Sequence, residues 1–206
     1  MQSEMLLAAT DALPLPGGDA GSPDARVLVG FGVPAELARF AARPGWTVYV
    51  PGHPDEVRRA VLTAMACGEQ TYVHVSAESN AEPHGGIDGF EPVREGSAGV
   101  VVAVGATLDP VLRATAGLDL AVLYTATVRP FDEVGLRTAV LAADHADVVL
   151  VEPCPRGTSA HHVAGTLVHV PHRLLALGGT RGTGGPDGVG GLDEAELALA
   201  VRDFMR

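Results

Sequence analysis

Apolar segments of strand length alternate with amphipathic segments of helix length, and this order constrains the fold more than any other feature. The second half of the chain shows it best, with expected strands at residues 99–105, 120–125, 146–153 and 172–177, and expected helices at residues 108–117, 132–144, 159–169 and 192–206. The expected strands are apolar throughout, which is typical of parallel strands covered by helices on both faces. The sequence therefore predicts an α/β fold with mainly parallel sheets.

The first half repeats the alternation over a shorter length. We expect strands at residues 26–31, 46–50 and 71–76 and helices at residues 34–42 and 55–68. In the second of these helices, acidic Asp55 and Glu56 suit the positive N-terminal end, and Gly68 suits the C-cap. A short helix is expected at residues 3–12, followed by loop chemistry at residues 13–25.

A polar seam separates the two halves. Residues 77–99 hold two prolines, five glycines and four glutamates, a composition typical of a connection between domains. We therefore expect an N-terminal helix and loop at 1–25, a first domain at 26–83, a linker at 84–98 and a second domain at 99–206. Each domain is predicted to have three α/β/α layers.

The charged residues exclude several classes of function. The 14 basic residues are all arginine, against 25 acidic residues, for a formal net charge of −11. Without lysine there is no P-loop and no Schiff-base chemistry, and a net negative chain is a poor ligand for nucleic acid. No stretch has the roughly 18–20 apolar residues of a membrane span, so we expect a soluble, cytoplasmic protein with two reduced cysteines.

Three motifs of the second half occur in a recognisable order. They are Ala103-Val104-Gly105 at the end of a strand, the turn from Thr127 to Asp132, and Glu152 at the end of another strand. In the turn, Pro130 fixes φ and Asp132 can cap the helix that follows. Over about 100 residues the series resembles the C-terminal domain of the transketolase family, which includes deoxyxylulose-phosphate synthase and the β subunits of 2-oxoacid dehydrogenases.

The first half resembles the end of that family's pyrimidine-binding domain, in shortened form. The matching residues are Pro44, Gly45, Val48, Pro51, Asp55, Glu56 and Val57. Many members of the family place an arginine on the last strand, toward the substrate, and this chain has His74 there. The resemblance makes His74 a candidate for the substrate cleft, while the alternative is a strand-end histidine without a ligand.

The resemblance also shows what the chain lacks. Family enzymes bind thiamine diphosphate and Mg²⁺ through a Gly-Asp-Gly…Asn motif and a glutamate, but this sequence contains no Gly-Asp-Gly. About 25 residues precede the first expected strand, and the surroundings of Glu4 do not match the glutamate motif. We therefore expect no catalytic, cofactor-binding or metal-binding residues here, and thiamine diphosphate with Mg²⁺ only in complex with a partner subunit.

Two hypotheses follow from the resemblance, and a third is independent of it. The chain, inactive alone, is either the partner of a separately encoded thiamine-diphosphate-binding subunit in a transferase, or a non-catalytic family member. Family members form dimers, so a homodimer or heterodimer is expected. The alternative is an unrelated α/β module that binds a small metabolite at its strand ends.

Two smaller features have weaker functional interpretations. His161, His162, His169 and His172 lie within twelve residues and could hold a divalent metal, although no carboxylate lies inside the run. Cys154 follows a strand and precedes a helix, a position that can lower a thiol pKa. We expect partly exposed imidazoles and an unreactive thiol.

Overall fold

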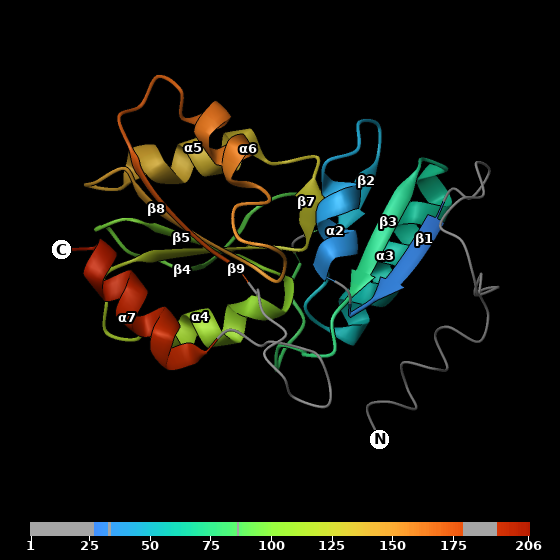
Figure 1. Ribbon diagram of the computed structural model, residues 1–206, viewed down its shortest axis with the longest axis horizontal. Coiled ribbons are helices and arrows are strands. Elements are labelled where there is room, and N and C mark those ends of the chain that lie inside the picture. Colours follow the sequence, from blue (N-terminus) through green and yellow to red (C-terminus); the bar gives the residue numbers. More distant parts are fainter. Residues whose placement is uncertain (1–26, 33, 86, 179–192) are drawn as a thin grey trace.

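The structure is a computed structural model that describes residues 27–32, 34–85, 87–178 and 193–206 (Figure 1). The helix and loop expected at 3–12 and 13–25 lie outside the described residues. The elements of the first half are β1 (Val27–Phe31), α2 (Pro34–Ala41), β2 (Thr47–Tyr49), α3 (Pro54–Cys67) and β3 (Thr71–Val75). Those of the second half are β4 (Glu91–Arg94), β5 (Val100–Val104), the 3₁₀ turn η1 (Gly105–Thr107), α4 (Leu108–Ala114), β6 (Ala121–Thr125), β7 (Thr127–Arg129), α5 (Glu133–Ala142), β8 (Asp147–Glu152), α6 (Ala160–Thr166), β9 (Arg173–Gly178) and α7 (Glu194–Phe204).

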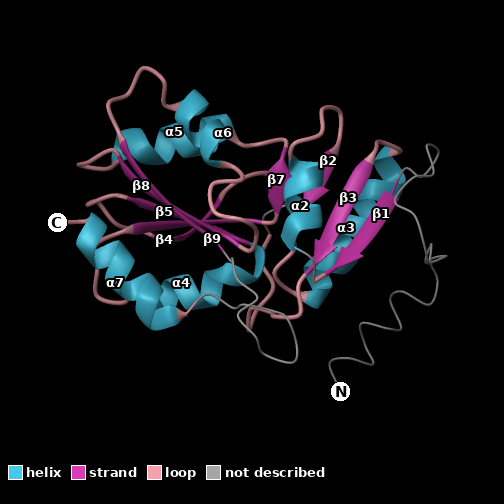
Figure 2. Cartoon of the chain, in the orientation of Figure 1, coloured by secondary structure: helices cyan, strands magenta, loops and turns pink. Residues whose placement is uncertain are grey.

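The strands form two sheets, which Figure 2 shows beside each other. The first has the order β1-β3-β2-β7, in which β1, β3 and β2 are parallel and β7 runs antiparallel to β2. The second has the order β4-β6-β5-β8-β9, in which only β4 is antiparallel to its neighbour. The predicted α/β class with mainly parallel sheets is confirmed.

Alternate side chains of the second sheet pack against different helices. On β5, Val100 and Val102 belong to a cluster that includes residues of α5 and α6. Their neighbours Val101 and Ala103 belong to a cluster that includes residues of α4 and α7. Because successive strand residues point to opposite faces, an all-apolar strand buries both faces. This arrangement places α5 and α6 on one side of the sheet and α4 and α7 on the other (Figure 2).

Two of the expected helix caps are present. Gly68 ends α3 in the left-handed conformation, with φ of 67°, and its N–H donates to the Ala64 carbonyl. Asp132 begins α5, where its Oδ1 accepts the N–H of Gly135 at 2.8 Å. The glycine and the aspartate that the sequence places at these positions thus satisfy backbone groups that a helix end leaves open.

The segment predicted as a linker contains a strand. Residues 91–94 form β4, which pairs with β6 at the edge of the second sheet, and the Arg94 guanidinium donates to the Leu120 carbonyl at 3.1 Å. An edge strand tolerates proline and charge, so Glu91-Pro92-Val93-Arg94 carries no apolar pattern that would have revealed it. The predicted linker at 84–98 therefore contributes residues 91–94 to the second sheet.

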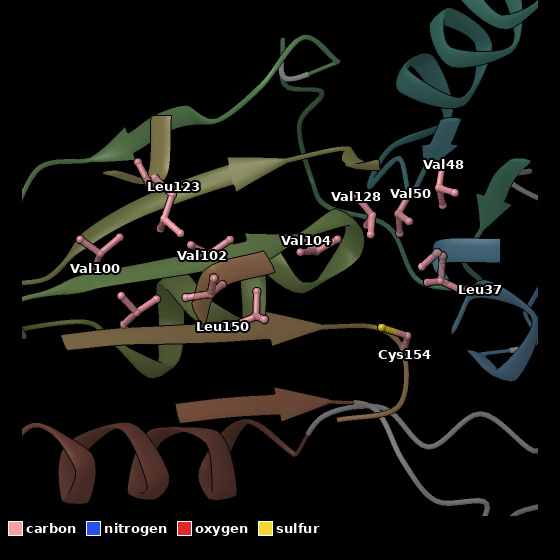
Figure 3. Packing of buried hydrophobic residues seen from close by; sticks show 14 of the residues in the cluster. Leu37, Val48, Val50, Val100, Val102, Val104, Leu123, Val128, Leu150 and Cys154 are labelled. Carbon is pink, nitrogen blue, oxygen red and sulfur yellow. The ribbon is translucent and has the colours of Figure 1, made fainter. Parts of the chain in front are cut away.

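The two sheets share one hydrophobic core. A single cluster contains Leu37, Val48 and Val50 of the first half together with Val104 and Leu150 of the second (Figure 3). The strand β7 strengthens the connection, because it follows β6 in sequence but pairs with β2 in the first sheet. Among the described residues, no helix has the length and apolar character needed to cross a membrane.

Candidate functional site

Two glycines allow the backbones of the two halves to meet. Gly105, at the end of β5, has φ of +60°, and a Cβ there would lie 2.6 Å from the Val50 carbonyl oxygen. Gly52 approaches from the other side, and a Cβ on it would lie 2.7 Å from the Gly105 carbonyl oxygen. The Ala-x-Gly motif of the sequence therefore ends in glycine for two reasons: a Cβ would collide with the Val50 carbonyl, and the positive φ is unfavourable for other residues.

A buried carboxylate lies next to this contact. Glu56 of α3 is 0 % exposed, and its two oxygens accept the N–H of Gly52 at 2.8 Å and the N–H of His84 at 2.7 Å. The Tyr124 hydroxyl of β6 also donates to Glu56 and accepts from the Gly52 N–H at 3.1 Å. Burial, followed by the hydrogen bond to Glu56, raises the pKa of Tyr124, so this phenol remains a donor.

The segment between β3 and β4 is hydrogen-bonded to both glycines of this junction. The Asn80 side chain donates to the Gly105 carbonyl at 3.1 Å, and its backbone N–H donates to the Gly52 carbonyl at 2.7 Å. Further along, the His84 ring packs against Tyr124 with 5.0 Å between ring centroids. Hydrogen bonds thus join this polar segment to both halves, so it does not act as a free tether.

Sequence reasoning missed this junction. The sequence places Glu56 near the positive N-terminal end of its helix, and the structure adds that its side chain is buried and accepts a hydrogen bond from Tyr124. The single sequence signal was Tyr124, a phenol in an otherwise aliphatic segment, because a buried tyrosine usually needs a polar partner. The partner itself is 68 positions away and could not be inferred from local pattern.

A small cavity of about 270 Å³ opens near the carboxyl ends of β2 and β3. It is lined by Pro51–Pro54, by Val57 and by Val75–Ser79. In open α/β sheets, ligands commonly bind at the carboxyl ends of parallel strands. This cavity therefore lies where small ligands commonly bind in such sheets.

His74 does not line that cavity. Its side chain is 2 % exposed, on the face of β3 that also carries Tyr72, and its Nδ1 lies 3.3 Å from the Tyr72 hydroxyl oxygen. Burial lowers the pKa of His74 to about 4, so the imidazole is neutral at physiological pH. A role for His74 in a substrate cleft remains a prediction, and a ligand could contact it only if the surrounding residues moved.

The histidine run and Cys154 show no arrangement for chemistry. Helix α6 ends at Thr166, so His162 and His169 do not share a helical face, and the described residues contain no group of three or more ligands suited to a metal. Cys154 is 1 % exposed, and burial raises the pKa of its thiol well above the ordinary value. Both cysteines are free, in agreement with the predicted reduced state.

The fully buried carboxylates of the described residues are not placed to contact thiamine diphosphate or its Mg²⁺ in the cavity near the ends of β2 and β3. The two fully buried glutamates are already engaged: Glu56 accepts from three donors, and Glu152 accepts the Ser159 N–H at 3.1 Å. Neither carboxylate points into the cavity at the ends of β2 and β3. The carboxylate that does line this cavity belongs to the exposed Glu78.

Comparison with solved structures places this architecture in a known class. A split-gene transketolase, described as an inactive β4 tetramer, superimposes with a TM-score of 0.74 at 18 % sequence identity, covering 98 % of this chain and 74 % of the other. The fold is therefore transketolase-like. This agrees with the resemblance seen in the sequence, although 18 % identity speaks for the fold alone.

A curated relative is considerably closer in sequence. The chain is 42 % identical over 202 residues to an uncharacterized 33.6 kDa protein in the fasciation locus of Rhodococcoides fascians. The match covers 87 % of this chain and 64 % of the relative, so the chain spans just under two thirds of that protein. No protein-family model matches the sequence.

Proposed function

We propose that this chain is a β-type partner subunit of a two-chain, transketolase-like transferase and has no ketol-transfer activity by itself. In the complex, thiamine diphosphate and Mg²⁺ are bound through residues of a second, separately encoded chain. The observation that carries the proposal is the match over 98 % of this chain to a split-gene transketolase whose β4 form is described as inactive. We place the complex in the cytoplasm and expect the chain to form at least a dimer.

The chemistry of the described residues supports a non-catalytic role for the isolated chain. Its buried carboxylates stabilise the junction between the sheets and the connection after β8, where each accepts backbone hydrogen bonds. Its buried imidazole, His74, is neutral and enclosed. A catalytic acid or base needs access to a reacting atom, which these groups do not have.

Affinity capture tests the partnership. The full chain is tagged and expressed in the organism from which it comes, and proteins that copurify with it are identified by mass spectrometry. We expect one of them to carry Gly-Asp-Gly followed by Asn. Mixing the two purified proteins with thiamine diphosphate and Mg²⁺ should produce transferase activity that neither has alone. If capture yields only further copies of this chain, the partnership is wrong and the non-catalytic family member is the better description.

Thermal unfolding of the chain alone tests the cofactor part of the proposal. We expect thiamine diphosphate and Mg²⁺ at about 1 mM each to leave the melting temperature unchanged, because a ligand stabilises only a fold that binds it. Thiamine with Mg²⁺ serves as the matched control. A rise in melting temperature with thiamine diphosphate and Mg²⁺, but not with thiamine and Mg²⁺, would show that this chain binds the cofactor itself.

A small-metabolite module is the second candidate function, favoured by the cavity near the ends of β2 and β3. It predicts binding of a small molecule without a protein partner. A thermal-shift screen of small acidic and neutral metabolites distinguishes the two functions, since the partner-subunit hypothesis predicts no stabilising hit. Ala77→Trp, which places a bulky ring at the cavity wall, should abolish any stabilisation that comes from binding in this cavity.

A further inference from the structure

The strand β1 forms one edge of the first sheet, on the side away from the second sheet (Figure 1). Among the described residues it pairs with β3 alone, so its other edge has no hydrogen-bonded neighbour there. Its faces are only partly covered, by the cluster of α2 around Leu28 and by the cluster of α3 around Val29, and Phe31 is 44 % exposed. An apolar strand with an open edge is a template for a further strand.

The other edge strands of the described sheets carry features that hinder the addition of a strand. The strand β4 contains charged residues and Pro92, and its register against β6 is irregular, while β7 ends at Arg129 and β9 begins with Arg173. In contrast, β1 reads Val-Leu-Val-Gly-Phe, with no charge, no proline and a regular register against β3. Proteins use charge, proline and bulges to keep an open edge from pairing. Their absence from β1 favours an edge that pairs in the assembled protein.

The backbone groups of this open edge are arranged symmetrically. The Gly32 N–H donates to the Val75 carbonyl of β3 at 3.0 Å, and the direction of the backbone groups alternates from one residue of a strand to the next. The N–H and C=O groups of Val27, Val29 and Phe31 therefore point away from β3. Because these three residues are symmetric about Val29, a two-fold axis there would pair each outward N–H with an outward C=O of an antiparallel second copy.

The side chains of β1 suit the same axis. It places Phe31 opposite Val27 of the second copy on one face, and Leu28 opposite Gly30 on the other, so large residues meet smaller ones. A two-fold axis also brings like charges together, which would oppose association in a chain with a net charge of −11. The five residues of β1 carry no charge. A second copy of this chain is therefore the occupant that the edge fits.

We propose that two copies of this chain associate through their β1 strands, which pair antiparallel about Val29 and join the two first sheets into one continuous sheet. The strand order β7-β2-β3-β1 is then followed by the same strands of the second copy in reverse order. Each open edge closes the other, so this surface joins two copies and no more. The interface assigns a surface to the dimer expected above and does not depend on the thiamine-diphosphate-binding partner.

Light scattering on the full chain tests the association, and wild type should have twice the mass of one copy. Val29→Pro removes an outward N–H and leaves the bonds to β3, so it should raise the Kd of the dimer at least about tenfold with unchanged circular dichroism. Val29→Ala keeps the N–H and should remain a dimer. A wild-type chain with the mass of one copy overturns the proposal and points to a cover within the chain. A folded Val29→Pro variant that dimerises as tightly as wild type also overturns it.

Disulfide cross-linking tests the register without a proline. In a Cys67→Ser background, where the remaining Cys154 is buried, Val27→Cys and Phe31→Cys are made in separate chains. The pairing places these two positions opposite each other, with Cα atoms about 5.5 Å apart, which a disulfide can span. An oxidised mixture should therefore give a linked dimer with one copy of each variant, whereas either variant alone has its cysteines about 14 Å apart and should not cross-link. No linked dimer in the mixture, or equal linking in the single variants, overturns the pairing.

Discussion

The hydrogen bond between Tyr124 and Glu56 matters because it joins β6 of the second half to α3 of the first half inside the protein. Tyr124→Phe removes a donor and leaves a buried carboxylate with fewer hydrogen bonds, so we expect a loss of about 1–3 kcal/mol in the free energy of unfolding by urea. Tyr72→Phe is the matched control, since it removes an equally buried hydroxyl that contacts only a neutral imidazole. Equal losses of unfolding free energy in the two variants would mean that the hydrogen bond to Glu56 stabilises the fold no more than the contact with His74 does.

Gly105 can be tested against a glycine of similar backbone conformation. Gly105 and Gly117 have φ of +60° and +79°, but a Cβ on Gly117 would meet no atom within 4 Å. Gly117→Ala should cost about 1–2 kcal/mol through backbone strain alone. Gly105→Ala should cost about 1–3 kcal/mol more, because the Val50 carbonyl must move. Similar unfolding free energies for the two variants would contradict the close approach of the two halves.

The low pKa of His74 gives the folded state a pH dependence of defined sign. The unfolded chain binds a proton below its ordinary pKa of 6.5, whereas the folded chain does so only near 4. Stability should therefore fall as the pH drops through this window, by at most about 1.4 kcal/mol per pH unit. Urea unfolding at several pH values should show less of this loss in His74→Gln, while the exposed His169→Gln should behave like wild type.

At the scale of elements, Asp132 links the start of α5 to the segment before β4. Its carboxylate accepts the N–H of Gly135 at 2.8 Å and the N–H of Phe90 at 3.0 Å. Asp132→Ala should lower the free energy of unfolding by about 0.5–2 kcal/mol, and Asp132→Asn, which can still accept, should lose less. Equal costs would mean that the one acceptor oxygen which asparagine keeps contributes nothing as a cap.

Most elements could be predicted because their own residues specify them. The apolar run of β5 and the cap at Asp132 depend on neighbours in sequence, and both are as expected. The short strands β4 and β7 were missed, since neither has a periodic apolar pattern and each forms only because a distant partner, β6 or β2, offers its edge. Short edge strands take their structure from the sheet they join.

At the scale of the whole molecule, the shared core predicts cooperative unfolding. The single tryptophan, Trp46, packs against the cluster that spans both sheets, so its fluorescence should change together with the far-ultraviolet circular dichroism of the entire chain. We expect the two signals to give the same urea midpoint. An earlier fluorescence transition would mean that the first sheet unfolds separately, against the single core.

The sequence by itself determined the α/β class, the order of the long elements and the resemblance to transketolases, because apolar periodicity, caps and turn residues act over a few neighbouring positions. Only the tertiary structure decided that the two halves share a core, that Glu56 reaches Tyr124 and that Glu152 is buried. These features depend on which segments meet after folding. A carboxylate has the same letter in the sequence whether water or protein surrounds it, and that environment determines what it does.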